Sequence, residues 1–280
     1  MQNIQETVRN VMLDNGIAPP ETILLDGVLH RFKDESGKLN CWYTAHVDGR
    51  AAGKVGNWKT GLKVNWKAEG NYPKLTDAQR LDFQIEKDCQ ELVRKSEEKA
   101  RHQEAAAKAS YIWNRATHTV THPYLTKKGI QAHCARLYKD SLVIPIWNKN
   151  VLASLQFIDK DGNKKMLSGG KLKGSSCNIG TYQSGNPLLI AEGFATGASL
   201  FESTGHITVI AFSAGNLKQV ATDVRLLYPC NEIIVCGDND ASGVGQRAAR
   251  EAALAIGGKY IIPELVGCDF NDVLNREVNV

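Results

Sequence analysis

The chain has 280 residues, of which 42% are hydrophobic and 23% charged, with a formal net charge of +4. These values indicate a soluble globular protein of one or two domains, and no apolar stretch has the roughly 20 residues that a membrane-spanning helix needs. The seven cysteines are odd in number and form no CxxC pair, which argues against a disulfide framework and a standard zinc site and favours a reducing, cytoplasmic location.

The charge is distributed unevenly along the chain. Residues 131–185 contain eight Lys and Arg against three Asp and Glu, whereas residues 186–280 contain six against eleven. A basic segment therefore precedes an acidic one. This order suits a protein that holds a polyanion with one part and metal ions with the other.

The first predicted module, residues 1–70, is small and rich in strands. Its opening stretch lacks the apolar run of a signal peptide, and it places three residues on one face of a short helix: Ile4, Val8 and Val11. From residue 20 onward, short alternating runs predict an antiparallel sheet with turns at 36–37 (Ser-Gly) and 48–49 (Asp-Gly). This module is too small to be a large catalytic core.

Residues 71–120 are predicted to form a helical connector. From Thr76, a plausible N-cap, to about Thr117 the sequence has strong helix formers and neither Gly nor Pro, which predicts one long charged helix or two in tandem. Its charges are most simply a face exposed to solvent.

Residues 121–185 are predicted to form a mixed β subdomain, and residues 186–280 an α/β domain. In the first, a short helix at 122–130 precedes strands joined by turns at 148–150 and 161–163. In the second, near-continuous apolar runs such as "PLLIA" and "EIIVC" alternate with helical segments. This alternation predicts a parallel sheet covered on both faces, whose sites lie at the carboxyl ends of its strands.

Three carboxylates follow strands of this predicted sheet. Glu192 ends the first apolar run, and Asp238 and Asp240 end the third. Grouped acids raise one another's pKa, whereas Mg²⁺ or Mn²⁺ prefers oxygen ligands and relieves the repulsion. The pattern therefore predicts a metal site for phosphoryl or nucleotidyl transfer, in which metal ions stabilise the attacking and leaving oxygens.

At these residues the sequence resembles a known family. "LLIAEGFAT" followed by "IIVCGDNDASGVGQRAA" is similar to the Toprim domain of bacterial primases, topoisomerases and some nucleases, a Rossmann-like parallel sheet with a Glu after one strand and Asp-x-Asp after a later one. The resemblance assigns Glu192, Asp238 and Asp240 as catalytic metal ligands. It leaves open whether Glu192 is a ligand or a general base.

The resemblance narrows to the primases of conjugative plasmids and mobile elements. "GCDFNDVL" is similar to their later acidic element and adds Asp269 and Asp272 to the metal ligands. "KKMLSGGKLKGSSCNIG" is similar to their basic motif, in which Gly169 and Gly170 would allow close approach of phosphates. We therefore expect a set of basic residues to bind nucleic acid or nucleotide: Lys164, Lys165, Lys171, Lys173 and Arg247. A solubilising hairpin is the alternative for the four lysines.

The family resemblance implies synthesis of short RNA primers on single-stranded DNA from ribonucleoside triphosphates. The zinc ribbon that bacterial primases carry at the N-terminus lacks its cysteines here, and the spacing of His30, Cys41 and His46 fits no common zinc finger. The tryptophans of this region, Trp42, Trp58 and Trp66, fit either stacking on template bases or packing in a core. Because no P-loop motif occurs, a replicative helicase is expected to act in trans.

Two other functions remain open from the sequence. A Toprim nuclease would use the same acids to hydrolyse a nucleic acid, and a non-catalytic protein would only bind single strands. The basic motif and the front module favour the primase over the nuclease, and the intact acids argue against a pure binder. Residues 212–217, "FSAGNL", predict a strand-to-helix turn whose opening amides could face a phosphate.

Overall fold

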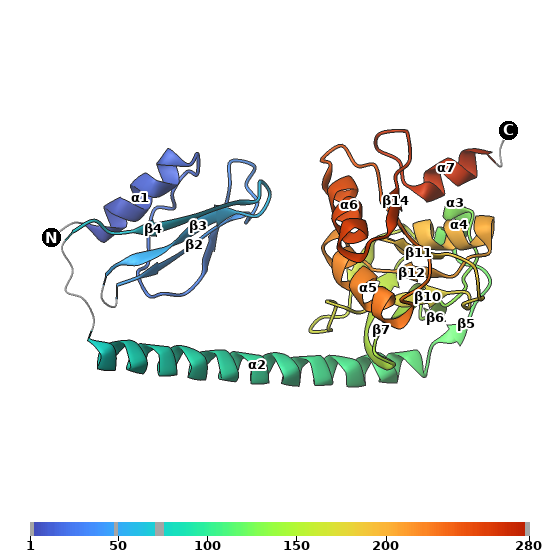
Figure 1. Ribbon diagram of the computed structural model, residues 1–280, viewed down its shortest axis with the longest axis horizontal. Coiled ribbons are helices and arrows are strands. Elements are labelled where there is room, and N and C mark those ends of the chain that lie inside the picture. Colours follow the sequence, from blue (N-terminus) through green and yellow to red (C-terminus); the bar gives the residue numbers. More distant parts are fainter. Residues whose placement is uncertain (1–2, 48–49, 71–75, 278–280) are drawn as a thin grey trace. The chain divides into compact units, whose positions relative to one another are not determined.

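The computed structural model describes residues 3–47, 50–70 and 76–277. The chain divides into two compact units, Met1–Lys87 and Asp88–Val280, each with its own hydrophobic core (Figure 1). None of the described helices is both long and apolar enough to cross a membrane.

The first unit is a four-stranded antiparallel sheet covered on one face by a helix. Val8 and Met12 of α1 (Ile4–Asp14) pack in one core with Tyr43 and Val55 of the sheet, which confirms the predicted apolar helix face. The predicted turn at 36–37 lies between the first two strands, whereas the predicted turn at 48–49 lies outside the described residues. The strands follow one another in sheet order: β1 (His30–Phe32), β2 (Cys41–His46), β3 (Ala52–Asn57) and β4 (Leu62–Lys67).

One continuous helix, α2 (Asp77–Trp113), follows and has 37 residues. It begins with a capping box, in which the Gln79 amide donates to Thr76 Oγ1 (3.3 Å) and the Thr76 amide donates to Gln79 Oε1 (3.0 Å). The prediction of a helix capped by Thr76 is confirmed, and the helix ends slightly earlier than expected. The last turns of α2 belong to the second unit, where Ala109 is buried against Leu152 and Leu155.

The second unit contains two five-stranded sheets. The first is antiparallel throughout, and its strands are β5 (Thr117–His118), β6 (Arg136–Tyr138), β7 (Ser141–Asn148), β8 (Val151–Ile158) and β9 (Lys164–Met166). The short helix α3 (Pro123–Lys128) precedes β6. Both predicted turns are confirmed, because Asn150 and Gly162 have positive φ angles (66° and 91°) between the strands that they join.

The second sheet has the order β10-β12-β11-β13-β14. Four strands are parallel, as predicted: β11 (Leu188–Ala191), β12 (Thr208–Ile210), β13 (Ile233–Cys236) and β14 (Lys259–Ile261). Strand β10 (Cys177–Ile179) pairs antiparallel with β12. It therefore belongs to this sheet, although it precedes the boundary that the sequence predicts at 186.

Helices cover this sheet on both faces, as Figure 1 shows. Leu188 and Ile190 face α5 (Ala214–Leu227) and α6 (Val244–Ile256) in one core cluster. The intervening Leu189 and Ala191 face α4 (Phe194–Thr204) and α7 (Phe270–Glu277). Because alternate residues are buried on opposite faces, β11 is apolar at every position. The covered parallel sheet predicted from the sequence is confirmed.

Candidate active site

Two of the predicted acids lie at one edge of the parallel sheet. Glu192 directly follows β11, and Asp238 follows β13 after Gly237. The two strands are hydrogen-bonded neighbours with Ala191 opposite Cys236, so their carboxyl ends coincide. Both carboxylates are only partly exposed at this edge.

Asp238 is the most perturbed carboxyl group of this edge. Its pKa is raised to about 7, first by burial and then by the charges of Glu192 and Asp269, while Lys164 acts in the opposite direction. Its Oδ1 atom is buried and has no hydrogen-bond partner among the described residues. A buried oxygen that is left unpaired costs free energy unless a cation or proton satisfies it.

Glu192 is fixed by a backbone amide. Burial raises its pKa, and the hydrogen bond from the amide of Ala214, the first residue of α5, lowers it. The charge of Asp240 adds to the rise, whereas the ammonium of Lys164 opposes it. From the sequence we expected the amides that open α5 to be able to face a phosphate, but one of them, the Ala214 amide, interacts with Glu192.

Asp240 has a different role from Asp238. The Ser242 hydroxyl and the Gly245 amide (2.6 Å) donate to its carboxylate, and these bonds lower its pKa to about 2. The amides of Ser242 and Val244 also point to Oδ1, at 2.9 and 3.3 Å. Asp240 therefore caps the loop that enters α6, and it contributes negative charge to the site from a fixed position.

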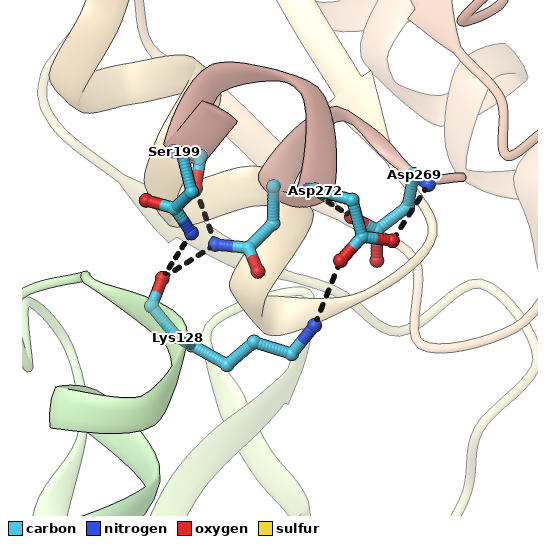
Figure 2. Close-up of polar contacts among 6 residues, drawn as sticks. Lys128, Ser199, Asp269 and Asp272 are labelled. Carbon is cyan, nitrogen blue, oxygen red and sulfur yellow. Dashed lines mark hydrogen bonds and ion pairs between the residues drawn. The ribbon is translucent and has the colours of Figure 1, made fainter. Parts of the chain in front are cut away.

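The later acids, Asp269 and Asp272, open α7. Each accepts the backbone amide of the other, at 3.0 and 3.2 Å. Asp269 lies close enough to Asp238 for its charge to raise the Asp238 pKa. Asp272 instead forms an ion pair with Lys128 (Oδ1 to Nζ, 3.4 Å), as Figure 2 shows. Of these two acids, Asp269 is the one whose charge acts on Asp238.

Lys128 joins α3 to α7 through its backbone as well. Its carbonyl oxygen accepts hydrogen bonds from the side-chain Nδ2 atoms of Asn271 and Asn275, both at 2.7 Å. The Asn271 Nδ2 atom also donates to Ser199 Oγ of α4 (Figure 2). None of these residues stands out in the sequence. A lysine in the last turn of a short helix and an Asn after an acidic pair carry no local pattern that distinguishes them from surface residues.

Within the basic motif, Lys164 is the residue that lies beside the acids. Although the residue as a whole is exposed, its ammonium is surrounded by protein groups, and this desolvation is the first cause that lowers its pKa, followed by the charge of Lys128. The charges of Asp269, Asp238 and Glu192 act in the opposite direction. A Cβ atom placed on Gly193 would lie 4.0 Å from Lys164 Nζ, so the lysine lies over the backbone next to Glu192.

The remaining basic residues lie on the surface. Lys165 and Lys173 are exposed, and Lys171 is exposed with its Nζ 3.0 Å from Asn148 Oδ1. Arg247 of α6 is also exposed, and its guanidinium lies 3.2 Å from the position that a Cβ on Gly243 would take. Lys164 is therefore the basic residue for which the structure gives an interaction with the acids.

The structure gives the paired glycines a role in packing. A Cβ atom on Gly170 would lie 2.1 Å from Ser154 Oγ and 2.5 Å from Ser154 Cβ. Gly169 has a φ of 78°, which favours glycine. Packing against β8 and a left-handed turn thus favour glycine at these two positions, and close approach of a phosphate stays a prediction.

The tryptophans of the first unit also separate into two kinds. Trp66 is 4% exposed and belongs to the core, and Trp42 is 8% exposed. The ring of Trp42 lies against Gly56 on one side and stacks on Trp58 on the other, with ring centroids 5.8 Å apart. Neither buried ring offers a face to a base. Trp58 is 50% exposed, and the Arg31 guanidinium lies 4.6 Å from its ring centroid.

The oxygen ligands at this edge suit a divalent metal only in part. Among the described residues, no three His, Cys, Asp or Glu side chains stand close enough together to hold an ion. The chemistry of Asp238 nevertheless fits a cation, because its buried Oδ1 lacks a partner and the carboxylates of Glu192 and Asp269 repel it.

Comparison with known proteins supports the sequence resemblance. Residues 187–279 match the family model described as a Toprim domain. The chain is 32% identical over 259 residues to a DNA primase TraC from Escherichia coli and 31% identical over 282 aligned positions to a second one. These alignments cover 86% and 94% of this chain but only 24% and 19% of the relatives, so the chain spans about a quarter or less of their length.

A solved structure also aligns, at a low level. The primase fragment of bacteriophage T7 primase-helicase protein has a TM-score of 0.45 and 15% identity, with coverage of 90% of this chain and 98% of that one. Similarity this low supports no statement about function. Residues 187–279 therefore match a Toprim domain, and the chain is similar over most of its length to one part of the proteins named DNA primase TraC.

Proposed function

We propose that this chain is the catalytic part of a DNA primase, which joins ribonucleotides into a short primer on single-stranded DNA. The observation that carries the proposal is the pair of partly buried carboxylates, Glu192 and Asp238, at the shared edge of β11 and β13 with Lys164 beside them. Relatives named DNA primase over most of the chain support the same assignment. The activity of such longer proteins is transferred here as a proposal.

Mg²⁺ or Mn²⁺ is the proposed cofactor, since Toprim domains generally bind divalent metal ions. Glu192 and Asp238 would be its main ligands, with Asp269 nearby. A bound ion would neutralise phosphate charge and favour ionisation of the primer 3′-hydroxyl. Asp240 keeps its loop in place through the amides of α6, and Asp272 holds Lys128.

Lys164 is proposed to contact the nucleotide. Its ammonium lies over Gly193 and beside the carboxylates, which attract it. At this position it can hold a phosphate oxygen at the same edge. The exposed residues Lys165, Lys171, Lys173 and Arg247 would contribute a positive potential that attracts template and nucleotide.

The outer face of the first sheet is proposed to contact the template. The register places Arg31, Lys54, Lys63 and Lys67 on the face opposite α1, together with Trp42 under Trp58. The strand residues of this sheet include no Asp or Glu. A basic face with one exposed aromatic ring is typical of surfaces that bind single strands, where bases stack and phosphates pair with lysines.

A helicase is proposed to separate the strands, and this activity lies outside the 280 residues, which contain no P-loop motif. The substrates of this proposal are therefore single-stranded DNA and ribonucleoside triphosphates.

The proposal is tested by primer synthesis. Wild-type protein is incubated with mixed-sequence single-stranded DNA, labelled ribonucleotides and Mg²⁺ or Mn²⁺, in parallel with Asp238→Asn and Glu192→Gln. Glu251→Gln provides a matched control, because Glu251 is an exposed acid on the outer side of α6. We expect short labelled products from the wild type and the control and none from the two site variants.

Two outcomes contradict the primase. Fragmentation of the DNA without new labelled product, abolished by Asp238→Asn, identifies a nuclease that uses the same acids. Binding of the DNA without either reaction, at all metal concentrations, identifies a binding protein.

A further inference from the structure

A buried amide side chain lies at the start of α5, outside the set of charged groups described above. Asn216 is 5% exposed and occupies the third position of the helix. Its Nδ2 donates to the carbonyl oxygens of Ser175 and Ala211, both at 2.9 Å, and its Oδ1 accepts the amide of Gly174 at 2.8 Å. All three bonds go to backbone atoms, so the side chain holds main chain on two sides.

One side is the basic loop. Gly174 also packs its α-carbon against α5, because a Cβ there would lie 3.1 Å from Asp223 Oδ2, and its φ of 68° favours glycine. The Gly174 carbonyl accepts the Asn148 side chain at 2.9 Å, and the Lys171 ammonium donates to the same Asn148. Through these bonds, the segment that carries Lys171 and Lys173 is fixed to the first turn of α5.

The other side is the edge that carries the acids. Ala211 follows β12, and two residues further on Ser213 opens α5 without a side-chain cap within the described part of the chain. Between them, Phe212 has a φ of 66°, a conformation that costs free energy for a bulky residue and persists only where its surroundings fix it. Ala214, the first residue of the helix, donates its amide to Glu192.

The first turn of α5 therefore contacts both halves of the proposed site. From these contacts we infer that Asn216 is a positioning residue, which holds the basic loop at a fixed distance from Glu192. We call the three hydrogen bonds of Asn216 the tether. The catalytic consequence of the tether rests on the proposed function, whereas the existence of the tether does not. A hydrophobic side chain of similar size would fill the same space without orienting either backbone segment, and it would leave three buried polar groups unpaired.

Limited proteolysis measures the tether without requiring any activity. Trypsin cleaves after Lys171 and Lys173, and a loop held on three sides is cleaved slowly, in proportion to how often it opens. In Asn216→Ala we expect cleavage at these two sites to be about tenfold faster, because loss of a buried hydrogen-bonded group increases opening by roughly that factor. Circular dichroism shows that the variant is folded at the assay temperature.

Val220→Ala is the matched control. Val220 lies one turn further along α5, is 2% exposed and belongs to the apolar core, so the substitution weakens the same helix without removing a tether. We expect cleavage after Lys171 and Lys173 to stay at the wild-type rate in this variant. Equal acceleration in the two variants, or no acceleration in Asn216→Ala, overturns the inference.

Gly174→Ala tests the same contact from the loop side. The added methyl group meets Asp223 and Gln219 of α5 and should loosen the loop as Asn216→Ala does. If both substitutions break one tether, the double variant is cleaved no faster than the more sensitive single variant, whereas independent effects multiply and contradict the inference.

The catalytic consequence is measured by a separate readout. We expect Asn216→Ala to raise the KM for nucleotide and for template about tenfold while kcat falls less, since the acids themselves are unchanged. A fall in kcat alone contradicts a positioning role. A wild-type protein that makes no primer contradicts the proposed function, and the proteolysis result then still decides whether the tether exists.

Discussion

The charge of Asp238 should destabilise the metal-free protein. The pKa of this carboxyl group is raised from 3.8 to about 7 in the folded state, so the folded chain holds its proton more tightly than the unfolded chain does. Stability from this group is fully present below pH 3.8 and is lost as the pH rises towards 7. Asp238→Asn, which carries no charge at any pH, should escape the loss.

The magnitude follows from the size of the shift. A rise of about three units at about 1.4 kcal/mol each corresponds to about 4 kcal/mol at pH 8. Because the carboxylate is partly exposed, solvent screening reduces this figure to about 2 kcal/mol, of which roughly 1 kcal/mol is lost between pH 5 and pH 8. We therefore expect Asp238→Asn to be more stable than the wild type at pH 8, with a smaller difference at pH 5.

Urea denaturation in EDTA at both pH values measures the difference, followed by a probe of the unit Asp88–Val280. Addition of Mg²⁺ should stabilise the wild type, because the ion and the proton compete for the same carboxylate oxygen. It should have less effect on Asp238→Asn, which lacks this carboxylate. The reasoning is refuted if metal-free Asp238→Asn is less stable than the wild type at pH 8, or if the difference between the two proteins does not change with pH.

Three further substitutions test other parts of the structure. Trp58→Ala should weaken binding of single-stranded DNA by about 1 to 3 kcal/mol through loss of the exposed ring, and unchanged fluorescence anisotropy would remove the first sheet from the template site. Ser242→Ala removes the main hydrogen bond that lowers the pKa of Asp240. The stability that the Asp240 carboxylate contributes is present above pH 3.8 and is lost as the pH falls through 2, so the urea midpoint of the variant should be lower than that of the wild type at pH 7 and equal to it near pH 2. A deficit that is equal at both pH values would contradict this. Gly170→Ala should destabilise the chain by about 1 to 3 kcal/mol, because the added methyl group collides with Ser154. In thermal denaturation, a second substitution, Ser154→Gly, should restore most of this loss, and a failure to restore it would show that the collision is not the cause.

The position of the acids could be read from the sequence because strand ends and residue types are local properties. Apolar runs that end in Glu192 and Asp238 indicate buried parallel strands, and parallel strands bring their carboxyl ends to one edge. The different roles of Asp238 and Asp240 could not be read in this way. They depend on which amides of α6 reach the loop, and that is set by the path of the backbone after Gly237.

Contacts between distant segments also escape a sequence pattern. The sequence predicts strand content before residue 186, but strand β10 crosses to the neighbouring sheet because its partner is β12. In the basic motif, Lys164 interacts with the acids because β9 directs it towards Gly193. The burial of Trp42 follows from Gly56 on the adjacent strand, a pairing that the register creates.

The clamp between α3 and α7 implies an order of assembly. Asn271 bonds the Lys128 carbonyl across 143 positions of sequence, and Asn275 does so across 147. Ribosomal synthesis is vectorial, so the contacts that hold α7 beside α3 cannot form until the segment up to Asn275 has emerged. The sheet around Glu192 and Asp238 can collapse earlier, since its strands are closer in sequence. Nascent chains that end before α7 would therefore carry an acidic edge without Asp269, and the centre would be completed only after the sheet has formed.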